Sequence, residues 1–572
     1  MIPTSEFSEG QSSNPRLDKP LFEERLVKII CIGAGASGLI LAYKLQRSFK
    51  NFELVVYEKN EGVGGTWFEN TYPGCACDIP AHTYTYSFEP KADWSAVYAN
   101  GQEIQQYFED FADKYDLKRF INFQRQVCHA KWDETSAEWQ VDVLCLEDGR
   151  IMHDHCNILV NASGALNAWK WPDIPRLHSF QGPLLHTAKW DKSADLKNKR
   201  VGIIGNGSSA IQLLPAIYPD VRQVTNFIRS PTWILPPFSE PQRLYTLAEH
   251  LRFKEDPKSH LALRKAQTAE AFKTFPVLIK DSEQQKYMSS ALTQILKDKL
   301  PPHLVDSLIP QTSVGCRRIT PGFDYLEKLS GEKTQVVVGD IRRVTERGVI
   351  DSEGKEHVLD VLVCATGFDT SFVPKFPIVG PKGVNMQTTW KDEVKAYLGV
   401  AAAGFPNYFT LFGAGSPAAT GPAMVIFELQ ADYILKMVDR YQTENIRSMA
   451  PKAEAVEDFI KHRDEFMKRT VMSENCRSWY KAGPSQQINA LWPGSGMHWY
   501  FVFKQDPRYE DWEWTYEGNR FSYFGNGFAS LELVDPGAVD WAFFIRNEDD
   551  DPHLSRGARI AAMSSSTNKT VF

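Results

Sequence analysis

The sequence lacks any uncharged apolar run of about 18 residues, so it predicts no helix that crosses a membrane. The nearest candidate, residues 397–415, is interrupted by Pro406 and Asn407 and contains four glycines, and we expect buried strands and turns there. The first 28 residues are polar, include three prolines and lack the apolar segment of a signal peptide. The end of the chain, residues 568–572, matches neither a prenylation box nor a peroxisomal tripeptide. We therefore expect a cytoplasmic protein.

Metal-ligand spacings are also missing from the sequence. The nine cysteines are an odd and scattered set, and none is spaced as in a zinc site. Cys75 and Cys77 form a C-x-C pair rather than the C-x-x-C of a dithiol redox site. We expect no bound metal and nine reduced, mostly buried thiols in a reducing compartment.

An excess of positive charge is absent too. The net charge of −7 and the pI of about 6.1 give no electrostatic reason to expect nucleic acid or an anionic membrane as a partner. What the chain does have is the composition of a folded globular protein, with 43% hydrophobic and 24% charged residues. Its 572 residues suit two or three domains. The oligomeric state is left open by these observations.

Two stretches of the chain, residues 27–58 and 201–229, each have the pattern of a strand, a glycine turn, a helix and a second strand. Residues 239–310 are rich in Leu, Ala, Lys, Glu and Gln with helical periodicity, which predicts a helical insertion in the second unit. Further strands are expected at 336–338 and 358–364, and past residue 395 the chain is expected to return to the first unit. The predicted fold class is α/β, with two Rossmann-like dinucleotide-binding domains.

The first glycine turn is Gly33-Ala-Gly35-Ala-Ser-Gly38, and Glu58 follows at the end of the next strand. Gly33 permits the tight turn, Gly35 lets the backbone approach a pyrophosphate, and Gly38 lets the helix pack closely on the strand. Free N–H groups at the start of the helix bind phosphates. Glu58 would accept hydrogen bonds from ribose hydroxyls, so this unit is predicted to bind a cofactor with free ribose hydroxyls, such as FAD.

The second glycine turn is formed by Gly205, Gly207, Ser208, Ser209 and Ala210. The strand that follows it ends on Arg229 and Ser230 rather than on an acid. An acid would repel a 2′-phosphate, whereas a guanidinium beside a hydroxyl would bind one. The second unit is therefore predicted to bind NADPH.

The expected boundaries follow from these two units. They are 27–168 and 386–545 for the FAD-binding domain, 169–238 and 311–385 for the NADPH-binding domain, 239–310 for the helical insertion, and 1–26 and 546–572 for flexible ends.

Residues 180–191, FQGPLLHTAKWD, match the fingerprint F-x-G-x-x-x-H-x-x-x-W-[PD] at every fixed position, namely Phe180, Gly182, His186, Trp190 and Asp191. The chain thereby resembles the class B flavin monooxygenases and, within them, the Baeyer–Villiger branch. Relatives that oxidise nitrogen or other heteroatoms usually lack the Trp-Asp pair. In the family the histidine lies on the linker between the nucleotide domains, so the resemblance implies that His186 couples their movement rather than transferring protons.

The resemblance covers about residues 27–515. Residues that match the family's flavin loop or imply cofactor contacts are Thr66, Trp67, Asp78, Tyr84, Val127 and Met424. Arg317 and Arg318 match the segment that carries the family's catalytic arginine. Residues 360–368 resemble its linker strand, 404–417 its returning flavin segment, and 478–480 a substrate-side loop.

The resemblance also implies a reaction, in which reduced FAD and O2 form a C4a-peroxyflavin that attacks a ketone. The resulting Criegee adduct gives an ester or lactone with one oxygen atom from O2, and NADP+ stays bound meanwhile. Both species are anionic, and an arginine supplies a fixed cation. Arg318 is therefore the predicted catalytic residue, and Asp78 is predicted to hold it and to assist proton handling.

The sequence departs from the family at a few positions. Arg317 stands where many members have lysine, which retains the charge for a 2′-phosphate. Ala76 stands where many have arginine, so one positive charge near the flavin is missing. The sequences CACD at 75–78 and CRR at 316–318 resemble members that act in secondary-metabolite biosynthesis, which implies a bulky polycyclic or polyketide-derived ketone.

Three other functions remain to be weighed. A flavin-dependent N- or S-oxidising monooxygenase would share this fold, but Trp190-Asp191 and Arg318 favour the ketone reaction. A flavin disulfide reductase would need the usual spacing of a redox cysteine pair. A non-catalytic nucleotide-binding protein would be expected to lack the charged site residues Asp78, Arg229, Arg317 and Arg318.

Overall fold

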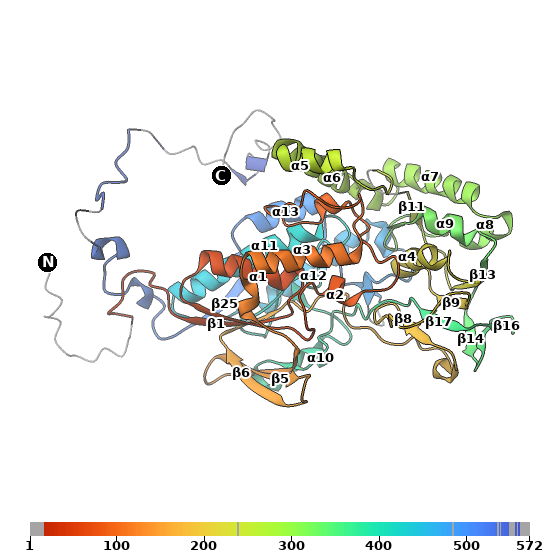
Figure 1. The fold of residues 1–572 in the computed structure, drawn as a ribbon. Helices are drawn as coiled ribbons and strands as arrows, with labels where there is room; N and C mark the ends of the chain where they lie inside the picture. The colour runs from red at the N-terminus through yellow and green to blue at the C-terminus, as the bar shows by residue number, and fades with distance from the viewer. Residues whose placement is uncertain are drawn as a thin grey trace.

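The computed structural model describes residues 16–236, 240–482, 486–534, 537, 539–547, 549, 555–556 and 559–560. Two units, each built around a mainly parallel sheet, lie side by side (Figure 1). No helix within these described ranges is long and apolar enough to span a bilayer.

The first unit is centred on a seven-stranded sheet. In spatial order its strands are β19 (Ala396–Tyr397), β20 (Ala401–Ala402), β21 (Tyr408–Thr410), β7 (Ile158–Asn161), β1 (Val27–Ile32), β2 (Phe52–Tyr57) and β3 (Ile121–Asn122). The five strands from β21 to β3 are parallel, and β19 and β20 are antiparallel. The return of the chain past residue 395 and the buried strands within 397–415 are thus as predicted.

The core of the first unit lies between its sheet and three helices, α1 (Ala36–Ser48), α3 (Gly101–Lys114) and α11 (Ala423–Thr443). α1 packs along α11, and the amine of Lys44 forms an ion pair with the carboxylate of Asp432 on α11. Helices far apart in the sequence therefore close the same core.

The second unit has a five-stranded parallel sheet. Its strands, in spatial order, are β13 (Thr334–Val338), β10 (Gln223–Ile228), β9 (Arg200–Ile204), β17 (Val361–Cys364) and β8 (Leu184–His186), and α4 (Ser208–Ile217) and α9 (Phe323–Leu329) belong to the same unit. The predicted strand at 358–364 begins only at Val361, because Val358 ends a separate hairpin strand, β16 (Glu356–Val358). Between them, the Asp360 carboxylate accepts two hydrogen bonds, of 2.6 and 3.1 Å, from the Arg200 guanidinium.

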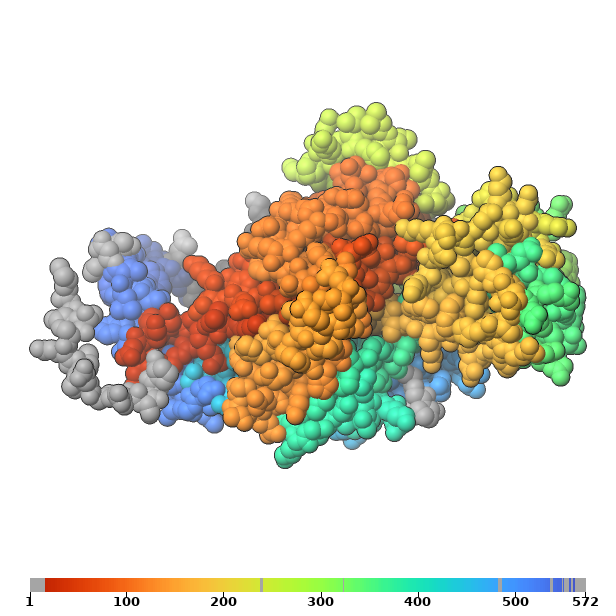
Figure 2. Space-filling model, turned by 60° about the horizontal axis from the view of Figure 1, so that its bottom comes forward, coloured from red at the N-terminus to blue at the C-terminus, as the bar shows by residue number. Residues whose placement is uncertain are grey.

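The predicted insertion is helical, and it divides between the two units. Its helices are α5 (Leu247–Glu255), α6 (Pro257–Phe272), α7 (Glu283–Lys299) and α8 (Pro302–Leu308). Phe253 of α5 joins the core of the first unit, and Nε2 of His260 lies 2.9 Å from Nδ1 of His82. Leucines of α7 and α8 join the core of the second unit. Figure 2 shows the yellow-green surface of α5 and α6 seated on the first unit.

Smaller elements complete the fold. The remaining helices are α2 (Thr66–Glu69), α10 (Met386–Thr389), α12 (Ala453–Met467) and α13 (Gly496–Lys504). A four-stranded sheet contains β18 (Ile378–Val379), β4 (Arg125–Asp133), β5 (Glu138–Cys145) and β6 (Ile151–Cys156). The other strands are β11 (Ile234–Leu235), β12 (Thr320–Pro321), β14 (Ile341–Val344), β15 (Gly348–Asp351), β22 (Ile446–Pro451), β23 (Lys481–Ala482), β24 (Gln487–Ile488) and β25 (Trp512–Tyr516).

Residues 16–25, within the leader expected to be flexible, pack on the first unit instead. The guanidinium of Arg16 is buried and donates a 2.6 Å hydrogen bond to the carbonyl of Gln442. The Arg25 guanidinium lies 4.2 Å from the centre of the Tyr441 ring. Residues 1–15 and most of 546–572 lie outside the described residues, so the expectation for them is untested.

We predict that Arg264→Ala weakens the docking of α6 on the first unit. Its guanidinium donates to the Thr85 hydroxyl and to three carbonyl oxygens, those of His82, Tyr86 and Ser87. Leaving such acceptors unpaired costs about 2–3 kcal/mol, so the midpoint of thermal unfolding should fall. Lys265→Ala, at the exposed neighbouring position, is the matched control. Equal unfolding midpoints for the two variants would contradict this account of the docking.

Candidate active site

The first glycine turn leaves room for a phosphate at the start of α1. Gly33 has a φ of +105°, and a Cβ there would lie 2.8 Å from the Ala162 carbonyl oxygen. A Cβ on Gly38 would lie 2.0 Å from the Gly33 carbonyl oxygen, so only glycine allows α1 to pack this closely on the turn. Gly35 faces the Cα of Gly65. The residues of this turn fit a pyrophosphate held by the N–H groups of α1.

Glu58 is placed at the same edge of the sheet. Its carboxylate accepts hydrogen bonds from the backbone N–H of Ala34, at 2.7 Å, and of Asn60, at 2.9 Å. Burial raises the pKa of the Glu58 carboxyl, and these two hydrogen bonds oppose the increase. The carboxylate therefore lies against the glycine turn, where the sequence predicts contact with ribose.

The remaining predicted flavin contacts lie around this turn. Thr66 begins α2, and Trp67 donates from Nε1 to the Tyr84 hydroxyl at 3.1 Å. Val127 and Met424 are both buried: Val127 on β4 belongs to the hydrophobic cluster that contains Ile32 and Tyr57, and Met424 on α11 to the one that contains Ala34. The structure thus places all five residues in or beside the first unit.

The second glycine turn is open where a phosphate would approach. Gly205 has a φ of +118°, and a Cβ there would lie 2.5 Å from the Ala365 carbonyl oxygen, whereas a Cβ on Gly207 would meet nothing within 4 Å. The Ser208 hydroxyl lies 3.0 Å from the Thr320 hydroxyl. Ser209 is within hydrogen-bonding reach of Tyr72, and Ala210 is buried in the second core. This arrangement fits a second pyrophosphate at the start of α4.

Arg229, Ser230 and Arg317 come together beyond the end of β10. The Arg317 guanidinium donates 3.0 Å hydrogen bonds to the Ser230 hydroxyl and to the Pro231 carbonyl. Burial lowers the pKa of Arg317, and the nearby charge of Arg229 lowers it further. Two cations held beside a hydroxyl form an arrangement that an added phosphate would stabilise.

An ion pair between Asp78 and Arg318 joins the two units. Both terminal nitrogens of the Arg318 guanidinium, Nη1 and Nη2, donate to the Asp78 carboxylate, Nη2 at 3.0 Å. The negative charge of Asp78 raises the pKa of Arg318 further above its usual value, so the guanidinium is a permanent cation. The Arg318 side chain is 36% exposed and that of Asp78 is 16% exposed. The pair thus presents a fixed positive charge at an accessible position.

Tyr72, whose segment resembles the family's flavin loop, and Gln212, which the sequence did not predict, hold the loop before Asp78 on α4. The Tyr72 hydroxyl donates to Oε1 of Gln212 on α4 at 2.6 Å, and Nε2 of Gln212 donates to the Ala76 carbonyl at 2.8 Å. A Cβ on Gly74 would lie 2.5 Å from the Gln212 carbonyl oxygen. The sequence Tyr-Pro-Gly marks a turn, but nothing in it identifies Gln212 as its partner.

The expectation of nine reduced thiols is wrong for one pair. Cys316 and Cys476 form a disulfide, and the other seven cysteines are free. The two bonded cysteines are 160 residues apart in the sequence, so no spacing rule reveals their pairing. Cys75 and Cys77 are free, as predicted.

The fingerprint segment contains β8, the edge strand of the second unit's sheet. His186 is buried and stacks on Trp169 with ring centres 4.5 Å apart. Its Nδ1 accepts a hydrogen bond from the Ala188 N–H, so Nε2 carries the proton and faces the Thr366 hydroxyl at 3.1 Å. Burial lowers the pKa of His186 to about 4, which keeps the ring neutral at physiological pH.

The other fingerprint residues lie before and after this strand. Phe180 is buried, and a Cβ on Gly182 would lie 2.5 Å from the Asp360 carbonyl oxygen. Trp190 is half-buried against the core of the second unit. Asp191 is exposed and accepts hydrogen bonds from the backbone and hydroxyl of Ser193, so it closes a turn.

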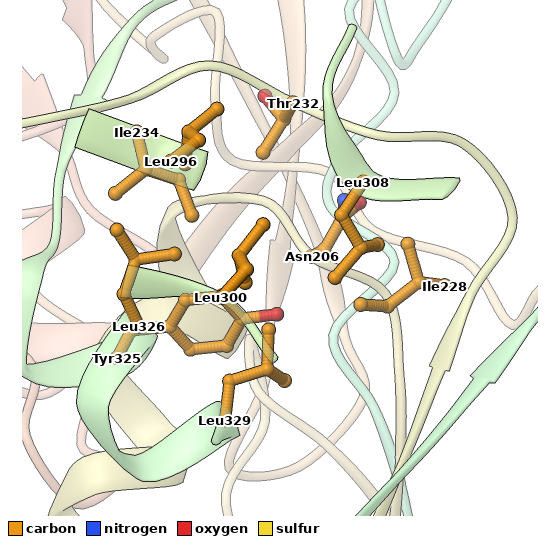
Figure 3. A pocket seen from close by; sticks show the side chains of 10 residues that line it. All are labelled: Asn206, Ile228, Thr232, Ile234, Leu296, Leu300, Leu308, Tyr325, Leu326 and Leu329. Atoms are coloured by element: carbon orange, nitrogen blue, oxygen red, sulfur yellow. The ribbon is translucent and has the colours of Figure 1, made fainter. Parts of the chain in front are cut away.

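A narrow apolar cavity lies beside the second glycine turn (Figure 3). Leucines of the insertion and of α9 line most of it, together with Asn206, Ile228 and Tyr325. Tyr325 already donates its hydroxyl to Asn226 at 2.8 Å, and Asn206 donates to the Ser230 carbonyl at 2.9 Å. The cavity therefore lies between the insertion and the turn, and the Thr232 hydroxyl is a further polar group in its lining.

Comparison with known proteins gives the same picture. Residues 26–309 match the family described as Flavin-binding monooxygenase-like. The chain is 39% identical over 542 residues to FAD-binding monooxygenase tazF of Aspergillus terreus, covering 92% of this chain and 96% of that protein. It is 32% identical over 478 residues to a Baeyer-Villiger monooxygenase of Pseudomonas aeruginosa, covering 82% and 88%. The solved structure of cyclohexanone monooxygenase from Rhodococcus sp. Phi1 bound to NADP+ has a TM-score of 0.75 and 26% identity, covering 86% of this chain and 100% of that chain.

With these similarities added to the two glycine turns, the chain belongs to the flavin-binding monooxygenase family. Within the family it is of the Baeyer–Villiger type, as residues 180–191 predict. The FAD named in one relative and the NADP+ bound in the solved structure agree with the predicted cofactors.

We predict that Arg317→Ala raises the KM for NADPH by about 10- to 100-fold, the loss of one charge-assisted phosphate contact, and leaves the KM for NADH nearly unchanged. Arg229→Ala should act in the same direction. Initial rates of coenzyme oxidation, measured with both coenzymes, test this. Arg222→Ala, at an exposed position before β10, is the control. A 2′-phosphate site at Arg317 would be refuted by equal losses with the two coenzymes.

Proposed function

We propose that this protein uses FAD, NADPH and O2 to insert one oxygen atom beside a ketone carbonyl and so forms an ester or lactone. The observation that carries the proposal is the ion pair of Asp78 and Arg318, a permanent cation between the two nucleotide-binding units. A cation that cannot lose its proton is what stabilises negative charge on a former carbonyl oxygen.

The residues described above would hold both cofactors. Gly35, in the turn formed by Gly33 and Gly38, would face the FAD pyrophosphate and Glu58 its ribose, while Gly207 would face the pyrophosphate of NADPH. FAD, when bound, supplies the two-electron chemistry that activates O2. The protein's own contribution is to bind, to orient and to exclude water.

Arg318 is the proposed catalytic residue because its charge is both fixed and accessible. Asp78 would act as its positioning residue, since the two hydrogen bonds fix the plane of the guanidinium. A bidentate carboxylate restricts an arginine in a way that a lysine at this position could not reproduce. The pair can therefore direct its positive charge toward one place without reorganising during the reaction.

An apolar cluster beside the ion pair supports a bulky ketone as the substrate. It contains Leu278, Met467, Val471, Met472, Tyr480, Ile488 and Leu491, with Ala418 and Ala419 packed against it. Tyr480 is close enough to Arg318 for their charges to interact. Phe275, Phe372 and Trp479 also pack against it, and apolar and aromatic side chains suit an apolar ligand, so we propose a polycyclic or polyketide-derived ketone.

We also propose that the boundaries expected from the sequence mark units that move during turnover. Neutral His186, stacked on Trp169 and facing Thr366, would couple the connection at 169–190 to that at 364–368. N- or S-oxidation is the second candidate function, because the same fold serves both reactions. The fixed cation favours the ketone reaction, since only an anionic attacking group and adduct require it.

The test is incubation of the flavin-loaded protein with NADPH, 18O2 and a panel of small and polycyclic ketones. We expect an ester or lactone with one labelled oxygen. Arg318→Ala should lower the rate of product formation by about 10²- to 10³-fold, the usual loss of about 3–4 kcal/mol when a preorganised donor is removed. Arg318→Lys should recover little of the rate, because lysine lacks the bidentate geometry.

Arg343→Ala, at an exposed position on β14, is the matched control and should retain the wild-type rate. A labelled sulfoxide or hydroxylamine without any ester would favour the second candidate function. Full activity of Arg318→Ala would remove the assigned role.

A further inference from the structure

Two loops that meet at the ion pair are tied to each other by a covalent bond. One loop, residues 313–318, carries Arg318, and the other, residues 474–481, carries Tyr480. Cys316 and Cys476 join them through a disulfide. The bond lies two residues before Arg318 and four residues before Tyr480. It is therefore located where it fixes both loops beside the proposed site.

Hydrogen bonds accompany the disulfide at these two loops. The Ser313 N–H of the first loop donates to the Glu474 carboxylate of the second at 2.8 Å. Within the second loop, the Lys481 amine donates to the Cys476 carbonyl at 3.2 Å and to the Glu474 carbonyl. These hydrogen bonds can break and form again, whereas the disulfide keeps the two loops together for as long as it is oxidised. We call the Cys316–Cys476 bond with these contacts the clasp.

The Arg318 side chain has one firm partner in the described residues, the carboxylate of Asp78. Asp78 lies in the first unit and Arg318 in the second, so movement between the units would carry one relative to the other. A firm anchor on the other side of Arg318 would keep its backbone in place. The clasp provides this anchor, because Cys476 lies within residues 386–545, the part of the chain expected to belong to the first unit.

We propose that Cys316 and Cys476 are positioning residues, whose disulfide holds Arg318 against the substrate-side loop and keeps oxygen transfer coupled to NADPH oxidation. The proposal rests on the role proposed above for Arg318. With the clasp open, the loop that carries Tyr480 separates from Arg318 and water enters. Reducing equivalents then leave as hydrogen peroxide instead of forming product.

The first experiment asks whether the bond exists in solution. The purified flavoprotein is denatured with an alkylating reagent and no reductant, and modified cysteines are identified by mass spectrometry. Seven modified cysteines and one linked peptide pair, Cys316 with Cys476, are expected. Nine modified cysteines would overturn the proposal.

The second experiment opens the clasp. Dithiothreitol reduces the disulfide by thiol–disulfide exchange, giving two thiols and the cyclic disulfide of the reagent. Cys316→Ser/Cys476→Ser removes it permanently. In both cases we expect product formed per NADPH oxidised to fall about tenfold, since small misplacements of a catalytic group cost up to about a hundredfold in rate. Cys128→Ser, a half-buried free cysteine on β4, is the matched control.

Product formed per NADPH oxidised is measured on folded, flavin-loaded protein. Loss of a purely structural disulfide would lower the unfolding temperature and leave this ratio unchanged. Dithiothreitol must affect the wild type and Cys128→Ser but not the double variant. An unchanged ratio in the reduced wild type would overturn the proposal. The rate of peroxide release without any ketone should also rise on reduction, and this readout stays valid even if the panel yields no ester. If no ketone of the panel gives an ester, but reduction still raises peroxide release, the result counts against the proposed function alone.

Discussion

The bidentate contact between Asp78 and Arg318 is the constraint on which the arrangement of this protein depends. The two residues are 240 positions apart and belong to different nucleotide-binding units. Their contact requires that the glycine turns of both sheets face a common region, so that two cofactors can meet there. The hydrogen bonds of Gln212 on α4 to Tyr72 and Ala76 serve the same purpose, because they fix the loop that carries Asp78 on the second unit.

Local patterns made much of the fold predictable. β1 begins at Val27 and β2 ends at Tyr57, within one residue of the predicted stretch 27–58, because a strand, a glycine turn and a helix leave their signals within some 30 residues. Charge chemistry predicted Arg229 and Ser230 as a 2′-phosphate site, and the resemblance to the family added Arg317. What escaped prediction depends on distant contacts. The Cys316–Cys476 bond, the partner of Tyr72 and the packing of Arg16 on Gln442 leave no mark in any short stretch of sequence.

The insertion shows how one segment can serve two cores. Its first two helices contribute Phe253 to the first unit, and its last two contribute leucines to the second. The composition of residues 239–310 predicts helices because their apolar positions recur with helical spacing, but this spacing does not identify the surface that the helices cover. Side chains such as Arg264, whose acceptors all lie in the first unit, determine which surface these helices cover.

The order of strands in the first sheet has a consequence for synthesis on the ribosome. β7 pairs with β21, whose residues follow it by about 250 positions, and α1 packs on α11. The domain that begins first is thus completed last, after the entire second domain has emerged. At about 5–20 residues per second, one edge of β7 stays unpaired for tens of seconds. A chaperone that covers this edge would protect it from aggregation until β21 is made.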